Sequence, residues 1–258
     1  MRSWTEAHRG MLWLAEREVL RVLKLWTQTV LAPVVASFLF IVVFGLSLSG
    51  RISPAGGVEY EVFIVPGLTI MAMVQAAYAN NASSVFQARS DRYINDVLAA
   101  PLRPWEVNVG VSLGGVVRAL LIGAGLLALA IPATGVPIRE PLVLALAVVF
   151  ALALFASLGV VVGIYAPTWD HAGFVNSIVI LPLTFLGGVF YSIEILPSPW
   201  EEISHANPIF YMVNAVRYGF LGESEVSVLL SFGVTAAITV AFVAWSQWLF
   251  ASGHKLKP

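Results

Sequence analysis

Residues 142–166 read LVLALAVVFALALFASLGVVVGIYA and contain no charged side chain. A helix of about 20 mostly apolar residues crosses the hydrocarbon core of a bilayer, which is about 30 Å thick. This stretch is therefore predicted to be a transmembrane helix. Five further stretches of the same kind lie around it, at about 25–48, 62–85, 107–131, 174–191 and 226–250. The sequence thus predicts six spans and an all-α integral membrane fold.

The composition agrees with a chain embedded in lipid. Of 258 residues, 59% are hydrophobic and only 11% are charged, whereas soluble proteins carry about 25% charged residues. This excludes a soluble enzyme, a nucleic-acid-binding protein and a disordered chain. The net charge of −1 gives no reason to expect nucleic acid as a partner. The absence of cysteine excludes disulfides, thiolate metal sites and cysteine nucleophiles.

The basic residues predict the orientation, because Lys and Arg near span ends resist translocation. With the N-terminus inside, ten basic residues lie on one side, three lie on the other, and Arg118 lies within a span. The ten are Arg2, Arg9, Arg17, Arg21, Lys24, Arg89, Arg92, Arg103, Lys255 and Lys257; the three are Arg51, Arg139 and Arg217. We therefore expect both termini in the cytoplasm, and an even number of spans agrees with this.

The segment 4–26 is predicted to be an amphipathic helix that leads into the first span. Apolar residues three or four positions apart define one face, namely Leu12, Ala15, Val19, Val22 and Trp26. Arg17, Arg21 and Lys24 lie on the opposite face. We expect this helix in the membrane interface, with its basic side toward anionic headgroups. It is either a simple anchor or an anchor that also touches a cytoplasmic partner.

The loop 86–106 is the longest one on the predicted cytoplasmic side. A short helix is expected at about 90–100, ended by Pro101. Ile94, Val97 and Leu98 form an apolar patch beside Tyr93, and charge is supplied by Arg89, Arg92 and Asp96. A small apolar knob with charged flanks suits docking into a groove on another protein. The alternative is that the patch rests on the membrane surface.

The segment 194–225 is expected on the outer side. It is rich in aromatic residues but is interrupted by Pro197, Pro199 and Pro208, which argues against a seventh span. Re-entrant or interfacial helices are predicted, either as an external lid over a pathway or as an aromatic anchor. The candidate outer-gate residues are Phe190, Tyr191, Pro208 and Tyr211.

Arg118 lies near the middle of the third span, where insertion costs about 2.5–3.5 kcal/mol. It either lines a pathway and meets an anionic substrate group, or donates hydrogen bonds to carbonyls of neighbouring helices. Pairs of glycines four apart, Gly110 with Gly114 and Gly159 with Gly163, predict close helix contacts.

The sequence shows no site of its own that could supply energy for transport. None of Lys24, Lys255 and Lys257 is followed by Ser or Thr, so a nucleotide-binding P-loop is excluded. No zinc-protease HExxH motif occurs, and no acid lies in any span to couple transport to protons or sodium. We therefore expect a protein that is not an enzyme and binds no cofactor, and that either acts passively or receives energy from a partner.

Several motifs resemble the ABC-2 class of ABC transporter permeases, the membrane subunits of exporters. They are FIVPG at 63–67, AYANNASS at 77–84, DVLAAP at 96–101, PLTFLGGVFYS at 182–192, HANPIFYM at 205–212 and RYGFLG at 217–222. The resemblance implies an elbow helix at 1–24, a transmembrane domain at 25–252 and a cytoplasmic tail at 253–258. It further implies a coupling helix around 89–100 and external re-entrant helices around 197–217.

The same resemblance implies partners and a location. Two permease copies, expected to be identical, would form the pathway in a bacterial inner membrane, and two separate ABC ATPase subunits would bind ATP and Mg²⁺. Export of an amphipathic drug, lipid or glycolipid is the leading hypothesis. The alternatives are a non-transporting sensor or assembly factor on the same scaffold, and a passive channel or scramblase.

Overall fold

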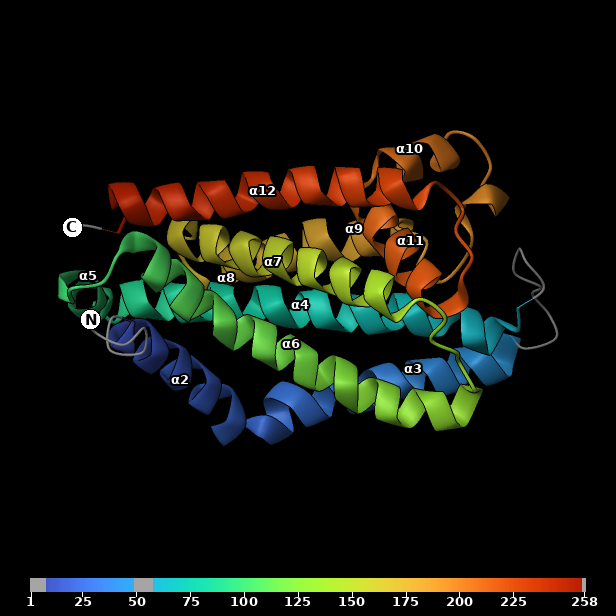
Figure 1. Ribbon diagram of the computed structural model, residues 1–258, viewed down its shortest axis with the longest axis horizontal. Coiled ribbons are helices and arrows are strands. Elements are labelled where there is room, and N and C mark those ends of the chain that lie inside the picture. The colour runs from blue at the N-terminus through green and yellow to red at the C-terminus, as the bar shows by residue number, and fades with distance from the viewer. Residues whose placement is uncertain (1–7, 49–57, 257–258) are drawn as a thin grey trace.

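The computed structural model describes residues 8–48 and 58–256, and every regular element in these ranges is a helix (Figure 1). The first half contains α2 (Arg9–Lys24), the π-helix η1 (Thr27–Leu31), α3 (Ala32–Leu48), α4 (Tyr60–Ser90), α5 (Ile94–Ala99) and α6 (Pro104–Thr134). The second half contains α7 (Pro141–Tyr165), α8 (Trp169–Phe174), the π-helix η2 (Val175–Ile180), α9 (Leu181–Leu186), η3 (Ile193–Ile195), α10 (Trp200–Ala206), α11 (Pro208–Leu221) and α12 (Val228–Ser252). The predicted helix residues 4–7 and the basic residues Arg2, Arg51 and Lys257 lie outside the described residues.

Six segments are long and apolar enough to cross a membrane, which confirms the predicted number of spans. They are Thr27–Gly45, Tyr60–Ser90, Pro104–Thr134, Pro141–Tyr165, Trp169–Leu186 and Val228–Ser252. The fifth is composite, because α8, η2 and α9 follow one another without a break. Each run is apolar because the interior of a bilayer offers no water to polar groups.

The fifth span differs from its predicted limits of 174–191. It begins at Trp169 and ends at Leu186, so Phe190 and Tyr191 lie beyond it. The end is set by two glycines: Gly188 adopts a φ of +73°, a left-handed conformation that turns the chain. A side chain on Gly187 would lie 3.1 Å from Ile209 of α11, so the turn also packs closely against that helix.

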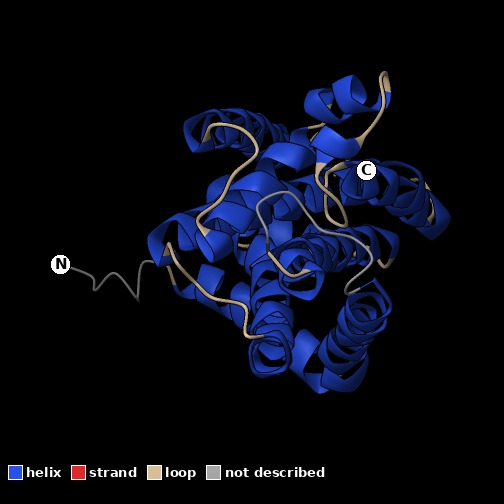
Figure 2. Ribbon diagram, turned by 90° about the vertical axis from the view of Figure 1, so that its right-hand side faces the viewer, coloured by secondary structure: helices blue, strands red, loops and turns tan. Residues whose placement is uncertain are grey.

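The centre of the bundle is α4, with the other long helices around it (Figure 1). Figure 2 shows the bundle from its end, with helices joined by loops. In the most apolar window of α4, 72% of the residues are buried inside the protein, against 17% for the first, fifth and sixth spans. The glycine pair predicted in α7 packs here, since a Cβ on Gly159 would lie 2.5 Å from the carbonyl oxygen of Tyr78. A Cβ on Gly163 would similarly lie 2.8 Å from that of Ala82. Small side chains thus let α7 approach the backbone of α4, as the spacing predicted.

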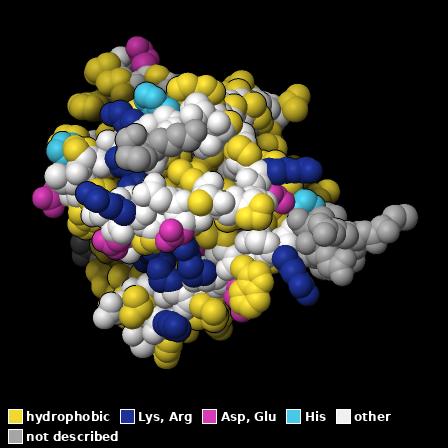
Figure 3. All heavy atoms as spheres, turned by 90° about the vertical axis from the view of Figure 1, so that its left-hand side faces the viewer, with side chains coloured by type: hydrophobic (Ala, Val, Ile, Leu, Met, Phe, Trp, Pro, Cys, Tyr) yellow, Lys and Arg dark blue, Asp and Glu magenta, His cyan; other side chains and the backbone are white. Residues whose placement is uncertain are grey.

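One end of the bundle brings together the start of α2, the end of α4, α5, the start of α6 and the end of α12 (Figure 1). We call it the basic end, because it carries most of the described cations: Arg9, Arg17, Arg21, Lys24, Arg89, Arg92, Arg103 and Lys255. Figure 3 looks onto this end and shows Lys and Arg side chains spread over it. The opposite end holds α10 and α11 (Figure 1).

Candidate functional site

The helix α2 packs against α6, and only one of its buried side chains, Val22, belongs to the face that the sequence predicted. Its buried side chains are Met11, Leu14, Glu18 and Val22. The glycines of α6 make room for them, since a Cβ on Gly110 would lie 3.0 Å from Leu14 Cδ2. A Cβ on Gly114 would likewise lie 2.6 Å from Glu18 Cβ. The predicted GxxxG contact in the third span is therefore a contact with α2.

The predicted faces of this helix need correction. Of the expected apolar face, Leu12 and Trp26 are exposed, Ala15 and Val19 are half-buried, and only Val22 is buried. Arg21, expected at lipid headgroups, instead points into the bundle toward Asn80. The physical reason is that leucine and tryptophan lose nothing by facing lipid, whereas a carboxylate needs partners there. The helix therefore turns Glu18 inward.

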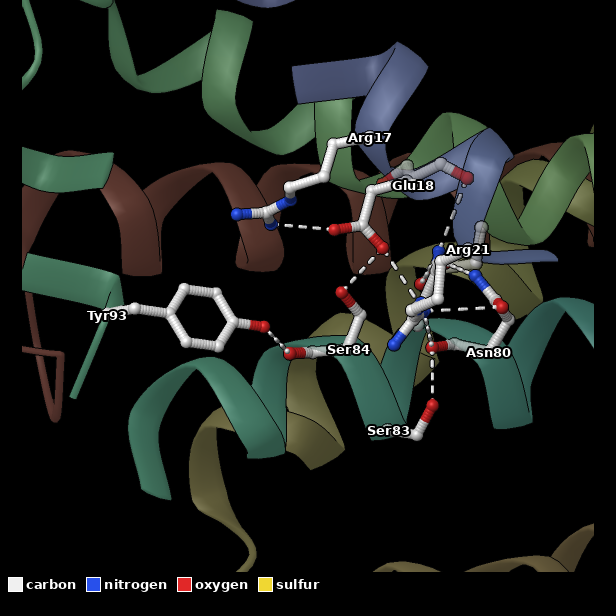
Figure 4. Close-up of polar contacts among 10 residues, drawn as sticks. Arg17, Glu18, Arg21, Asn80, Ser83, Ser84 and Tyr93 are labelled. Carbon is white, nitrogen blue, oxygen red and sulfur yellow. Dashed lines mark hydrogen bonds and ion pairs between the residues drawn. The ribbon is translucent and has the colours of Figure 1, made fainter. Parts of the chain in front are cut away.

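Glu18 is the centre of a polar cluster between α2 and α4 (Figure 4). Its side chain is only 2% exposed. Oε1 lies 2.7 Å from Nη2 of Arg17, and Oε2 accepts a hydrogen bond of 2.7 Å from the Ser84 hydroxyl. Nη2 of Arg21 lies 3.1 Å from Oε2. The buried charge is thus compensated from its own helix and from α4, as a buried ion requires.

The cluster continues through the NNASS part of the 77–84 motif into two more spans. Arg21 donates to the carbonyl oxygen of Asn80 at 3.2 Å and to its Oδ1 at 3.3 Å. Asn81, fully buried, donates to the carbonyl oxygens of Ala156 in α7 at 3.1 Å and Ser112 in α6 at 3.5 Å. Polar residues link α2 to three spans here. The available signal was two asparagines and two serines inside an apolar run.

The helix α5 begins at Ile94, four residues later than predicted, because Arg92 has a φ of +63° and interrupts the helix. Its apolar patch faces the protein: Ile94 is buried, and Val97 and Leu98 are half-buried against residues of α2, α4, α6 and α12. Arg92 and Asp96 are exposed. The structure therefore places the charged flanks, and not the apolar knob, at the surface.

The residues beside α5 attach it to the spans. Arg89 donates from Nη1 to the carbonyl oxygens of Gly163 at 3.0 Å and Ala166 at 3.2 Å, which fixes the end of α7 to α4. Tyr93 lies beneath the guanidinium of Arg17, 5.1 Å from the ring centre, and its hydroxyl donates to the carbonyl oxygen of Ser84 at 3.5 Å. Burial raises the pKa of Tyr93, so it stays protonated as a donor at neutral pH.

Arg118 both donates a hydrogen bond to a backbone carbonyl of a neighbouring helix and lines a cavity, so it has the contacts that each of its two predicted roles requires. Nε donates to the carbonyl oxygen of Thr29 at 2.9 Å, and Thr29 belongs to the π-helix η1. π-helical turns are frequent at functional sites. Arg118 also lines a partly open cavity of about 340 Å³ between α3, α4, α6 and the fifth span, which we call the inner cavity. Gln75 and Asn176 line the same cavity, and the Nε2 and Oδ1 atoms of these two amides are buried without a protein partner. Polar atoms without partners inside an apolar cavity are suited to bind a ligand.

The four candidate gate residues do not form one group. Phe190 lines the inner cavity with Arg118 and stacks on Phe185 at 5.3 Å between ring centres. Tyr191 is half-buried and follows it in the turn after the fifth span. Pro208 is the first residue of α11, and Tyr211 donates from its hydroxyl to the carbonyl oxygen of His205 at 2.9 Å. The structure thus unites Arg118 with Phe190 and keeps the other three outside the cavity.

Arg217 in α11 holds together the segment 188–225 at the end opposite the basic end. In the sequence it counted only as a basic residue, and this structural role was not predicted. It is buried, pairs with Glu225 at 2.8 Å and also donates to the carbonyl oxygen of Gly188. Its guanidinium lies 4.1 Å from the ring centre of Phe63. Burial lowers the pKa of Arg217 to about 10, opposed by the Glu225 charge, so it is protonated at neutral pH. Within the described ranges, no three His, Cys, Asp or Glu residues cluster as metal ligands would.

Comparisons with known proteins agree with this architecture. Residues 9–221 match the family model described as ABC-2 type transporter. The inner membrane transport permease YadH of Escherichia coli (strain K12) is 39% identical over 89% of this chain and 91% of its own length. Nodulation protein J of Rhizobium leguminosarum bv. viciae is 27% identical over 87% of this chain and 88% of its own. The family match runs from the start of α2 to the end of α11.

Proposed function

The chain belongs to the ABC-2 type transporter family, and on that premise we propose that it is the permease subunit of an ATP-driven exporter. Two copies would form the translocation pathway, and a separate ATPase subunit on each would supply the energy. The chain has no P-loop, so this division of labour provides the nucleotide site that it lacks. The basic end lies in the cytoplasm in this proposal, as the excess of Lys and Arg there favours.

The observation that carries the proposal is how α5 is built into the spans. Its apolar residues pack against α2, α4, α6 and α12, while Arg92 and Asp96 remain exposed for a partner. A partner that grips the charged surface therefore moves a unit to which several spans are fixed. Arg89 and Tyr93, which lie just before α5, strengthen this attachment: Arg89 donates a hydrogen bond to α7, and Tyr93 lies against Arg17 of α2. In this role α5 is the coupling helix, and α2 is the elbow helix.

The inner cavity is the proposed part of the pathway. Apolar and aromatic walls surround Arg118 and the free amide atoms of Gln75 and Asn176. This combination suits an amphipathic cargo (a drug, lipid or glycolipid) whose polar part is anionic or carries hydrogen-bonding groups. Phe190 would close the cavity toward α11, with Tyr191, Pro208 and Tyr211 as the outer lid. Movement of the lid would follow from differential contacts in two states.

The test is purification of the chain from its native membrane, with mass spectrometric identification of the bound subunits. We expect an ATPase with a P-loop. Reconstitution of the two in vesicles should give ATP-dependent movement of a fluorescent phospholipid or glycolipid probe. Bound ATPase without any flux would identify a sensor or assembly factor instead. Flux in vesicles without the ATPase would identify a passive channel or scramblase.

A further inference from the structure

A second hollow lies at the basic end, between the end of α4, the turn before α5, the link from α7 to α8 and the end of α12. Its volume is about 580 Å³, and it is separate from the inner cavity around Arg118. Three cations line it, Arg89, Arg92 and Lys255, and its lining contains no acidic residue. It therefore presents a concentrated positive charge in a concave site. We call it the basic pocket.

Among residues 8–48 and 58–256, no carboxylate forms an ion pair with a cation of the basic pocket. Within the described residues, the guanidinium of Arg92 makes no hydrogen bond or ion pair, and Arg89 uses only Nη1, for two carbonyl oxygens. Lys255 lies over the ring of Tyr165, with Nζ 5.0 Å from its centre, and no carboxylate of the described part of the chain pairs with it. Arg92 and Lys255 are exposed, so their charges are available to an anion that enters the pocket.

The backbone holds two of these side chains in an uncommon way. Arg92 and Lys255 have φ values of +63° and +58°, and they are the two non-glycine residues with positive φ in the described part of the chain. Long side chains seldom adopt this left-handed conformation, which costs about 1–3 kcal/mol. Both occurrences line one pocket, although the residues are far apart in sequence. Such strain typically accompanies a site with a function.

The surroundings place the basic pocket at the level of lipid headgroups. Its wall includes Ala166 and Pro167, directly after a membrane-crossing helix. Trp169, which contacts Phe86 of the lining, is 49% exposed, and Trp245 and Trp248 near the end of α12 are also exposed. Exposed tryptophan gathers at the boundary between hydrocarbon and water.

We propose that the basic pocket binds the phosphate of an anionic phospholipid, with Arg89, Arg92 and Lys255 around the headgroup and the acyl chains in the adjoining lipid. Basic pockets between transmembrane helices on the cytoplasmic side bind such headgroups by this chemistry. Because the pocket joins α4, α7 and α12, a bound lipid clamps these spans together beside α5. The assignment to the cytoplasmic leaflet rests on the orientation proposed above, whereas the binding itself does not.

The test uses the purified, delipidated full-length permease without its ATPase, and native mass spectrometry to count bound lipid. Phosphatidylglycerol is titrated against phosphatidylcholine with the same acyl chains. Wild type should bind phosphatidylglycerol preferentially. The double variant Arg92→Gln with Lys255→Gln should bind it about twenty-fivefold more weakly, since each cation contributes about fivefold. The matched control, Arg9→Gln with Lys24→Gln, removes two cations of the same end that lie outside the pocket and should bind like wild type.

Three outcomes would overturn the proposal. The first is equal binding of the two lipids by wild type, or equal binding by the pocket and control variants. The second concerns the melting temperature, which a ligand of the pocket should raise more in wild type than in the pocket variant. If inorganic phosphate produces as large a difference as phosphatidylglycerol does, the pocket is a site for a free anion. The third is that the single variant Lys255→Gln, which leaves the exposed charges around α5 in place, keeps its lipid binding but loses ATPase copurification, which assigns the pocket to an acidic surface of the ATPase. None of these bears on whether the protein transports, because the lipid is counted without ATP.

Discussion

Replacing Glu18 with Gln should loosen the attachment of α2 to the rest of the protein. The change keeps the shape of the side chain and one oxygen for the Ser84 hydroxyl. It removes the charge that faces Arg17 and Arg21 and turns an amide NH₂ group toward one of them. Two donors then face each other in a site where Glu18 is almost fully buried. We expect α2 to detach more often, while the six spans stay assembled.

The magnitude follows from the partners of the carboxylate. A hydrogen bond to a charged group contributes about 1.5–3 kcal/mol when it is buried. The side chains of Arg17 and Arg21 are 44% and 30% exposed, so they can turn to water or headgroups, and each ion pair is discounted to below about 1 kcal/mol. The sum of a weakened Ser84 bond and two lost ion pairs is about 2 kcal/mol. This corresponds to a roughly thirtyfold larger equilibrium constant for detachment.

The chain contains no cysteine, which makes a direct assay available. Val22, one turn after Glu18 in α2, has no exposed surface, so a Val22→Cys thiol reacts with maleimide only when α2 detaches. Labelling rates in detergent report that opening equilibrium when closing is fast. Val22→Cys is the common background. Glu18→Gln should label about thirtyfold faster than the background, and Glu16→Gln, an exposed acid of the same helix, should label at the background rate.

Equal labelling of the Glu18 and Glu16 variants would refute the reasoning, because it would mean that the cluster contributes nothing to holding α2. A circular dichroism spectrum of each variant checks that the helical content is unchanged. A Glu18→Gln protein that no longer folds would also contradict us, since the predicted loss is restricted to one peripheral helix.

Three further changes test other parts of the structure. Gly159→Ala should lower the melting temperature by the equivalent of about 1–3 kcal/mol, because the added Cβ meets a backbone carbonyl of α4; Gly233→Ala on α12, where the space is open, should leave it unchanged or higher. Arg118→Gln should insert normally and lose about tenfold in ATP-dependent transport, and wild-type flux at equal expression would remove this residue from the pathway. Arg92→Glu with Asp96→Lys should reduce copurification of the ATPase about tenfold at unchanged melting temperature; undiminished copurification would show that α5 docks elsewhere or not at all.

The spans could be predicted because lipid imposes a simple rule on the sequence. A segment that crosses it must be apolar and helical throughout, and runs such as 142–166 satisfy the rule over their whole length. The glycine pairs were also informative, since Gly110 with Gly114 and Gly159 with Gly163 do lie at helix contacts. Their spacing could not identify the partner helices, which proved to be α2 and α4.

The faces of α2 could not be predicted by the pattern that works in water. In a soluble protein the apolar stripe faces the core, but beside lipid both environments accept Leu12 and Trp26 equally. Only the polar residues determine which face of the helix packs against the bundle. Glu18 determines it here, because its partners Ser84 and Arg21 are at the bundle side. The end of the fifth span was misjudged for a related reason. The apolar residues that follow Gly188 continue the hydropathy run, although the backbone has already turned.

The unequal burial of the spans determines how the protein responds to bilayer thickness. In the outer helices Thr27–Gly45, Trp169–Leu186 and Val228–Ser252 only 17% of the residues in the apolar window are buried inside the protein, whereas 72% are buried in α4. When a membrane thins or thickens, hydrophobic mismatch acts on helices that touch acyl chains and makes them tilt. A change in bilayer thickness should therefore tilt the three outer helices, while the central helix α4 keeps its position.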